Sequence, residues 1–340
     1  MNRRDGVNET LMSAPREVTL ELTRGCNLSC PFCYVRLLGN RQETGDLRAS
    51  EWLLFLEELA DARVFLVGFV GGEPFVYPGF GELVDKVRCL PMRFKVFSNG
   101  TLLDEAWAER LANTGRCHYV QISVDGREAE HDAVRGKGNW RKAVQALRNL
   151  KACGIPRHVN MVAARETADS VVDAARWLIE ETQPQQLRIQ IPLGVPEEQR
   201  LPYPTLAQVI RKTLALAKDY PNVVKGGVLD YYRKAREPGI PQKEVPSCRP
   251  QLGASCFVRH DGMLTPCDMA RESVMGRIND VPFLELWRHS PIWANARDAV
   301  LVPRELPEEC KGCPWAWRCQ GHCLSCLSNE FCYRKLHEFL

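Results

Sequence analysis

The stretch RGCNLSCPFCYV, residues 24–35, comes directly after EVTLEL at 17–22, the first apolar run of the chain. It places Cys26, Cys30 and Cys33 in a C-x3-C-x2-C loop. Three thiolates leave one iron of a [4Fe–4S] cube without a protein ligand, and such an open position lets a cofactor or substrate bind. A zinc site would usually recruit a fourth Cys or His, and the loop has none. The loop therefore favours an iron–sulfur cluster over zinc.

Beyond this loop, short β-rich runs alternate with amphipathic segments up to about residue 218. The apolar runs are residues 17–22, 64–70, 94–97, 118–124, 158–163 and 187–193. Helical spacing of apolar residues appears between them, at 50–62, 104–112, 140–153 and 170–181. Six strand-helix units in a row predict an α/β fold with a parallel sheet. Functional side chains are then expected at the C-terminal ends of the strands.

Polar motifs follow three of these predicted strands. After the second stands Gly71-Gly72-Glu73-Pro74, in which glycines expose backbone carbonyls and Glu73 either adds negative charge toward a cation or fixes the loop. After the third comes Ser98-Asn99-Gly100-Thr101, and after the fourth Ser123-Val124-Asp125-Gly126, with Arg135 further on. The carboxyl ends of parallel strands share one edge of a sheet, so we expect these motifs to lie near the cysteine loop.

The cysteine loop and these motifs resemble the radical S-adenosylmethionine (AdoMet) superfamily. Phe32 fills the aromatic position of the family's C-x3-C-x-aromatic-C loop, and residues 71–74 match its GGEP motif. The resemblance implies a partial (β/α)6 barrel in which the GGEP loop binds the AdoMet ammonium, while Ser123 and Arg135 contact its carboxylate. Ser98 and Asn99 belong to the same predicted cofactor site. Asp125 either hydrogen-bonds near the ribose or is a turn aspartate before glycine.

The resemblance also implies a reaction. A reduced cluster donates one electron to bound AdoMet and breaks its S–C5′ bond, which yields methionine and a 5′-deoxyadenosyl radical that abstracts hydrogen from the substrate. A flavodoxin or ferredoxin-type protein is the implied reductant.

The chain contains 15 cysteines, and twelve of them fall into three groups. A chain of this length does not depend on disulfides, so metal binding is the favoured explanation. Regular alternation ends around Pro238–Pro246, which predicts one domain over residues 1–237 and a cysteine-rich one over 238–340. Within the second, CFVRHDGMLTPC predicts a hairpin with a two-residue turn at Asp261-Gly262. That turn would set Cys256 opposite Cys267, on one face of the ladder.

Two spacings in the second region resemble the cysteine-rich SPASM domain. They are Cys248-x13-Gly262-x4-Cys267 and Cys310-x2-Cys313-x5-Cys319-x3-Cys323, followed by Cys332. The resemblance implies two auxiliary clusters, hence three [4Fe–4S] clusters in all. One would use Cys248, Cys267 and Cys323 with Cys256 as candidate fourth ligand; the other would use Cys310, Cys313, Cys319 and Cys332, with Cys326 as a competitor for the last place. A zinc ribbon is the alternative for Cys310 and Cys313.

Asp268 directly follows Cys267. In sulfatase-maturing enzymes an aspartate so placed takes the proton from the residue being oxidised, and the resemblance carries that catalytic role to Asp268. A solvated aspartate is the alternative.

Most relatives with this pair of domains act on ribosomally made peptides or proteins, so the resemblance implies a peptide maturase. Little chain precedes the first strand, which favours a separate leader-peptide recognition protein. A radical enzyme for a small molecule, such as a tetrapyrrole or redox-cofactor precursor, is the second hypothesis. A pure electron carrier is the third, but it needs neither an open iron nor a GGEP loop.

Charge and hydropathy exclude other partners. Lys and Arg number 45 against 42 Asp and Glu, and no basic tract or dedicated motif points to nucleic acid. No stretch approaches the roughly 20 apolar residues of a membrane span. We expect a cytoplasmic protein without a membrane partner.

Overall fold

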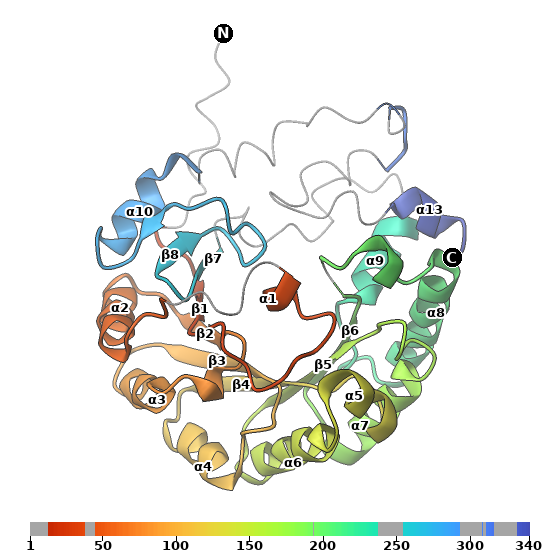
Figure 1. The fold of residues 1–340 in the computed structure, drawn as a ribbon, viewed down its shortest axis with the longest axis horizontal. Coiled ribbons are helices and arrows are strands. Elements are labelled where there is room, and N and C mark those ends of the chain that lie inside the picture. The colour runs from red at the N-terminus through yellow and green to blue at the C-terminus, as the bar shows by residue number, and fades with distance from the viewer. Residues whose placement is uncertain are drawn as a thin grey trace.

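The computed structural model describes residues 13–37, 45–192, 194–236, 254–292, 308, 311–315 and 332–340. Its central element is a curved nine-stranded sheet in the order β6-β5-β4-β3-β2-β1-β7-β8-β9 (Figure 1). Seven of the strands are parallel, and six of these follow the chain order along the sheet: β1 (Glu17–Glu21), β2 (Leu66–Val70), β3 (Arg93–Ser98), β4 (Cys117–Ser123), β5 (Arg157–Val162) and β6 (Gln186–Gln190). The sheet does not close, so the predicted partial barrel is confirmed.

Helices cover the outer face of the curved sheet, and Figure 1 shows them as an open arc around it. They are α2 (Ala49–Asp61), α3 (Phe80–Arg88), α4 (Glu105–Asn113), α5 (Glu128–Arg135), α6 (Asn139–Ala152), α7 (Val171–Thr182), α8 (Tyr203–Asp219) and α9 (Val228–Arg236). Two 3-10 turns, η2 (Pro74–Val76) and η3 (Glu197–Gln199), lie in loops, and the short α1 (Tyr34–Leu37) follows the cysteine loop. No helix in the described ranges is long and apolar enough to cross a membrane.

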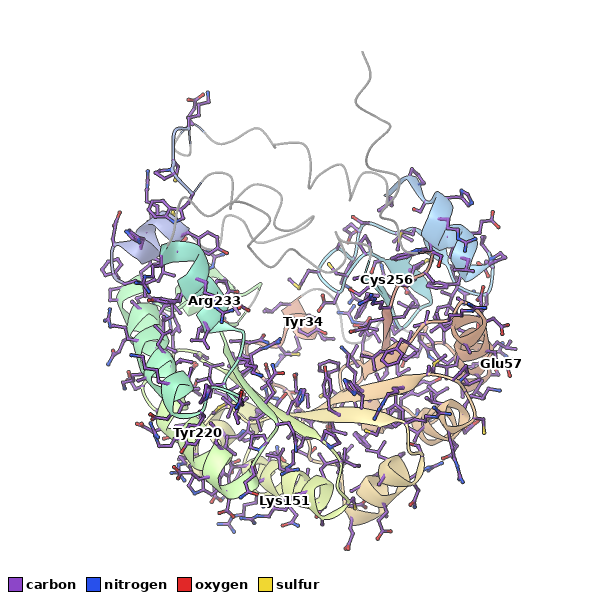
Figure 2. All side chains as sticks on the ribbon, turned by 180° about the vertical axis from the view of Figure 1, so that it is seen from behind. Tyr34, Glu57, Lys151, Tyr220, Arg233 and Cys256 are labelled. Atoms are coloured by element: carbon purple, nitrogen blue, oxygen red, sulfur yellow. The ribbon has the colours of Figure 1, made fainter. Side chains whose placement is uncertain are left out.

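Most barrel strands have one apolar face and one mainly polar face. In β6, Leu187 and Ile189 are buried in the main hydrophobic core, whereas Arg188 between them is only partly buried. Side chains alternate along a strand, so Arg188 lies on the opposite, concave face. Figure 2 shows Tyr34 of α1 toward the concave centre and Glu57 of α2 among the outer helices. The core therefore lies between sheet and helices, and the concave face is left for polar groups.

The second region continues the same sheet. Strand β7 (Ser255–Val258) pairs in parallel with β1, with Ser255 beside Glu17. Strands β8 (Met263–Thr265) and β9 (Gly276–Arg277) then add antiparallel pairs, and α10 (Phe283–His289) follows. Near the other end of the arc, α13 (Tyr333–His337) packs against α8 and α9 (Figure 1).

The predicted register of the β7–β8 hairpin is wrong by one residue. Phe257 pairs with Thr265, and the turn comprises residues 260–262 rather than Asp261-Gly262 alone. Gly262 has φ +84°, and a left-handed glycine closing a three-residue loop is a common hairpin geometry. Extending this register sets Ser255, not Cys256, opposite Cys267. Cys256 is instead buried in the main core next to Val18 of β1.

Candidate functional site

The three-cysteine loop lies at the C-terminal end of β1 in an apolar setting. Cys30 is buried, and Cys26 and Cys33 are partly buried. A separate small apolar cluster surrounds them, formed by Leu28, Phe32, Val134, Ala164 and Val195. Phe32, at the predicted aromatic position, also lies under the Arg135 guanidinium, whose carbon is 5.8 Å from the ring centre. The loop thus offers sulfur ligands in a largely water-poor environment.

Burial makes these thiols difficult to ionise. Burial raises the pKa of Cys26 to about 11, with a smaller contribution from the nearby Glu73 charge, and burial also raises the pKa of Cys30. A thiolate here therefore needs the positive charge of bound iron. Two donors already point at the Cys26 sulfur, the Leu28 N–H at 3.4 Å and the Asn99 amide at 3.8 Å.

In the part of the chain that the structure describes, no three Cys, His, Asp or Glu side chains are gathered like the ligands of a single metal ion. A cube of four irons suits a wider arrangement, because each thiolate binds a different iron. Three thiols on one short loop at a sheet edge therefore fit a cluster better than a mononuclear site.

The GGEP loop is held against the cysteine loop by backbone contacts that only glycine permits. A Cβ on Gly72 would lie 2.2 Å from the Gly25 carbonyl oxygen, and one on Gly71 would lie 2.5 Å from that of Thr23. The Gly72 N–H donates to Thr23 O at 2.7 Å, and the Glu73 N–H donates to Gly25 O at 2.9 Å. The two glycines are needed for this close approach of chain to chain.

Glu73 fixes the loop. It is fully buried, and its carboxylate accepts hydrogen bonds from Ser98 Oγ at 2.8 Å and the Asn99 N–H at 2.7 Å. It also accepts from the Phe75 N–H at 3.3 Å, just after Pro74. Burial raises the pKa of Glu73 to about 7 despite these donors. Of the two predicted roles, attraction of a cation and fixing of the loop, the structure shows the second: Glu73 links the ends of β2 and β3 by hydrogen bonds.

Asn99 connects that assembly to the cysteine loop. Its amide nitrogen donates to Asn27 Oδ1 at 2.9 Å, and Asn27 in turn donates to Thr101 Oγ1 at 2.8 Å. Asn27, between the first two cysteines, was not predicted as a site residue. Three of the predicted motifs therefore meet at one sheet edge, as the parallel topology requires.

Asp125 and Arg135 form a buried ion pair. Arg135 Nε donates to Asp125 Oδ2 at 2.5 Å, and the Val162 N–H donates to Oδ1 at 2.8 Å. Asp125 is 0% exposed and the Arg135 side chain 10%. The pair holds the guanidinium beside Phe32 and the cysteine loop. The structure thus gives Asp125 a third role, as the partner of Arg135. Ser123, at the end of β4, is partly buried nearby.

A second buried ion pair joins the barrel to the second region. Arg271 donates to both oxygens of Glu21, at 3.0 and 2.7 Å. Glu21 ends β1, directly before the cysteine loop. The sequence carries one signal for this pair: Glu21 is a charged residue between Leu20 and Leu22 in the first strand run.

Asp268 and Tyr34 lie near this pair. Burial raises the pKa of Asp268, and the Glu21 charge adds to the effect. Burial raises the pKa of Tyr34 strongly, and the charge of Asp268 raises it further. The Tyr34 hydroxyl and the Asp268 carboxylate therefore share one neighbourhood, and Figure 2 shows Tyr34 at the concave centre.

The auxiliary ligand sets are only partly visible. Cys248, Cys310, Cys319, Cys323 and the competitor Cys326 lie outside the described residues. Cys267 and Cys313 are partly buried, and Cys332 precedes α13 with its N–H donating to Tyr203 OH at 2.9 Å. The Trp315 ring lies 5.0 Å from that of His337 in α13, so the segments carrying Cys313 and Cys332 pack together.

Comparisons with known proteins agree with this geometry. The model of the radical SAM superfamily matches residues 20–178, and that of the SPASM iron–sulfur cluster-binding domain matches 248–314. The PqqA peptide cyclase of Gluconobacter oxydans is 30% identical over 332 residues, which cover 92% of this chain and 87% of that protein. The chain belongs to the radical SAM superfamily and carries a SPASM domain.

Two further comparisons cover most of the chain. The AdoMet-dependent heme synthase of Methanosarcina barkeri is 25% identical over 92% of each chain. The crystal structure of Streptococcus suis SuiB bound to the precursor peptide SuiA shares the fold, with a TM-score of 0.73 and 18% identity over 92% of this chain and 72% of that one. The protein is thus a radical SAM enzyme, and AdoMet and [4Fe–4S] clusters are its cofactors.

Proposed function

We propose that this radical SAM enzyme modifies a ribosomally synthesised peptide or protein. The observation that carries the proposal is the match to a peptide cyclase over nearly the whole of both chains. This match extends through both domains, so it includes the cysteine-rich second region as well as the cysteine loop of the barrel.

When bound, AdoMet and a reduced cluster supply a 5′-deoxyadenosyl radical. The chain's own residues organise the site. Cys26, Cys30 and Cys33 are the ligands of that cluster, and Glu73 holds the loop in place. Arg135, held by Asp125, offers a guanidinium for the AdoMet carboxylate, next to the Ser123 hydroxyl. The apolar groups around the cysteine loop keep out water that would quench a radical.

Asp268 is proposed as the base that takes a proton from the peptide during its oxidation. The raised pKa of Asp268 favours proton uptake. Asp268 also lies near Tyr34, on the concave side of the sheet. Replacing Asp268 with Asn should abolish product while leaving AdoMet cleavage intact. Replacing Asp280, an exposed acid of the same region, with Asn is the control. Unchanged product in Asp268→Asn would rule out this role.

Two auxiliary clusters complete the proposal. Cys248, Cys267 and Cys323, with Cys256 as fourth candidate, would hold one; Cys310, Cys313, Cys319 and Cys332 would hold the other. The packing of Trp315 on His337 supports the second set, whereas the burial of Cys256 in the core weakens its place in the first. A flavodoxin or ferredoxin-type reductant and a separate leader-peptide recognition protein are the proposed partners.

The first test is an anaerobic assay of reconstituted protein with dithionite and AdoMet, in which iron and 5′-deoxyadenosine are counted. We expect about twelve irons per chain, and about eight in the Cys26/Cys30/Cys33 triple alanine variant, because each cube holds four. That variant should form no deoxyadenosine. The matched control is the Cys89/Cys153 double alanine variant, which changes two thiols outside the site and should behave as wild type.

The substrate is tested with the peptide encoded by a short reading frame beside the gene. A change in the mass of that peptide, dependent on AdoMet and on the three cysteines, would confirm the proposal. A loaded enzyme that forms no deoxyadenosine with or without it would contradict it.

A small tetrapyrrole substrate is the second candidate, because the heme synthase relative also matches over nearly the full length. The same assay separates the two. Deoxyadenosine formation that is stimulated by a tetrapyrrole precursor, and by no peptide, would favour the small-molecule enzyme.

A further inference from the structure

Three polar side chains form a row across the concave wall of the barrel. The sheet register places Ser123 of β4 beside Asn160 of β5, and Asn160 beside Arg188 of β6. All three alternate with buried apolar residues that face the helices, so all three belong to the concave face. The row begins at Ser123, a predicted AdoMet contact, and continues through Asn160 to Arg188.

Two atoms of this row are buried without a partner. Asn160 Oδ1 and Arg188 Nε are both shielded from solvent, and neither has a hydrogen-bond partner among the residues that the structure describes. A buried polar atom left without a hydrogen bond destabilises the fold. One atom is an acceptor and the other a donor, so a ligand that satisfied both would carry a donor and an acceptor of its own.

The charge of Arg188 is also unbalanced. Two other cations of this face have acidic partners: Lys95 pairs with Glu17, and Arg271 with Glu21. Among the residues that the structure describes, no carboxylate pairs with Arg188. Burial lowers the pKa of His158, one strand over, to about 4, and the charge of Arg188 contributes to that shift. This wall therefore favours an anion.

The chain beyond β6 is shaped around Arg188. A Cβ on Gly226 would lie 3.0 Å from Arg188 Nε, and one on Gly227 would lie 1.9 Å from Ile189 O. Both glycines have positive φ, of +70° and +61°, which favours glycine over other residues. The turn before α9 thus packs tightly over the guanidinium and holds it in place.

We propose that Arg188 and Asn160 bind an acidic residue of the peptide substrate. The guanidinium would donate to the Asp or Glu carboxylate, and Asn160 Oδ1 would accept a backbone N–H of the peptide. An acidic residue within a peptide carries both a side-chain carboxylate and a backbone N–H. The inference rests on the proposed function and adds the class of residue that enters the barrel. AdoMet also carries a carboxylate, but the buried Arg135 beside the cysteine loop is available for it.

The test uses four libraries of acetylated hexapeptide amides, with Glu, Asp, Gln or Lys fixed at the third position and the other positions randomised. Holoenzyme with AdoMet is incubated anaerobically with each library, and retained peptide is quantified by ultrafiltration and mass spectrometry. We expect the Glu or Asp library to be retained about tenfold better than the Gln library, which corresponds to one charge-assisted pair.

Three variants sharpen the result. Arg188→Met should lose the acidic preference, and Arg141→Met, which removes an exposed cation on α6, should keep it. Asn160→Asp places a carboxylate beside Arg188 and should also erase the preference, while leaving the guanidinium and its packing unchanged. Iron content and the melting temperature show that each variant is folded.

Equal retention of the Glu, Asp and Gln libraries by wild type, or an unchanged preference in Arg188→Met, would overturn the proposal. The proposal would also be overturned if Arg188→Met raised the AdoMet dissociation constant by the same factor as it lowered retention of the acidic libraries. The row would then bind the AdoMet carboxylate. None of these results affects deoxyadenosine formation by wild type, so the proposed function is judged separately.

Discussion

Arg271 holds the buried carboxylate of Glu21 by two hydrogen bonds across 250 residues of sequence. The side chains are 8% and 1% exposed. Because Glu21 directly precedes the cysteine loop, the pair ties that loop to the segment after β8.

Replacing Arg271 with Met should lower the free energy of unfolding by about 3–5 kcal/mol, because the Glu21 charge is then buried without a partner. The Glu21→Leu/Arg271→Met double variant removes both charges and should regain most of that loss. The urea midpoints of the holoenzymes give the comparison. A double variant that unfolds as early as Arg271→Met would show that the ion pair is not the cause.

Replacing Gly72 with Ala should disrupt the GGEP loop, because the new Cβ would lie 2.2 Å from the Gly25 carbonyl oxygen and 2.6 Å from that of Arg24. We expect a loss of about 1–3 kcal/mol or more in stability and weaker AdoMet binding, measured by equilibrium dialysis. Gly81→Ala is the matched control: it lies in α3, and its new Cβ meets only the flexible end of Arg110. Equal effects at the two positions would contradict the prediction.

The raised pKa of Glu73 predicts a pH-dependent loss of stability. In the folded state this carboxyl binds its proton up to about pH 7, against an ordinary value of 4.5, so the folded state holds more protons between these values. Wild type should therefore lose stability relative to Glu73→Gln as pH rises from about 4.5 to 7, and the difference should stay constant above 7. Melting temperatures from pH 5.5 to 8.5 test this. A difference that does not change across that range would refute it.

Replacing Asp125 with Asn should weaken AdoMet binding. The variant keeps an oxygen for the Val162 N–H but leaves the buried Arg135 without its counter-charge. We expect the AdoMet dissociation constant to rise about tenfold, the equivalent of 1.4 kcal/mol. Glu128→Gln breaks the exposed pair with Arg141 and serves as control, with a change under about twofold. An unchanged constant in Asp125→Asn would separate this ion pair from the cofactor site.

Local patterns explain why much of this architecture could be predicted. The C-x3-C-x2-C loop, the strand runs and the motifs at strand ends each span a few residues, and parallel topology alone brings those ends together. Glu73 shows the limit of such reasoning, because its choice between two roles depended on Ser98 and Asn99 being within hydrogen-bond distance.

Features that depend on register or on distant contacts could not be predicted. The position of Cys256 in the hairpin differs from the predicted one by one residue, because the turn contains three residues rather than two. The Glu21–Arg271 pair joins residues that no local pattern relates. The row of Asn160 and Arg188 exists only once β5 and β6 are aligned.

The pairing of β7 with β1 also bears on how the chain is made. Strand β1 leaves the ribosome well before β7, so one of its two edges has no partner until Ser255 follows. An open strand edge is a site of mispairing between chains. The cysteine loop next to that edge therefore completes its surroundings late in synthesis, and cluster insertion would follow translation of the second domain.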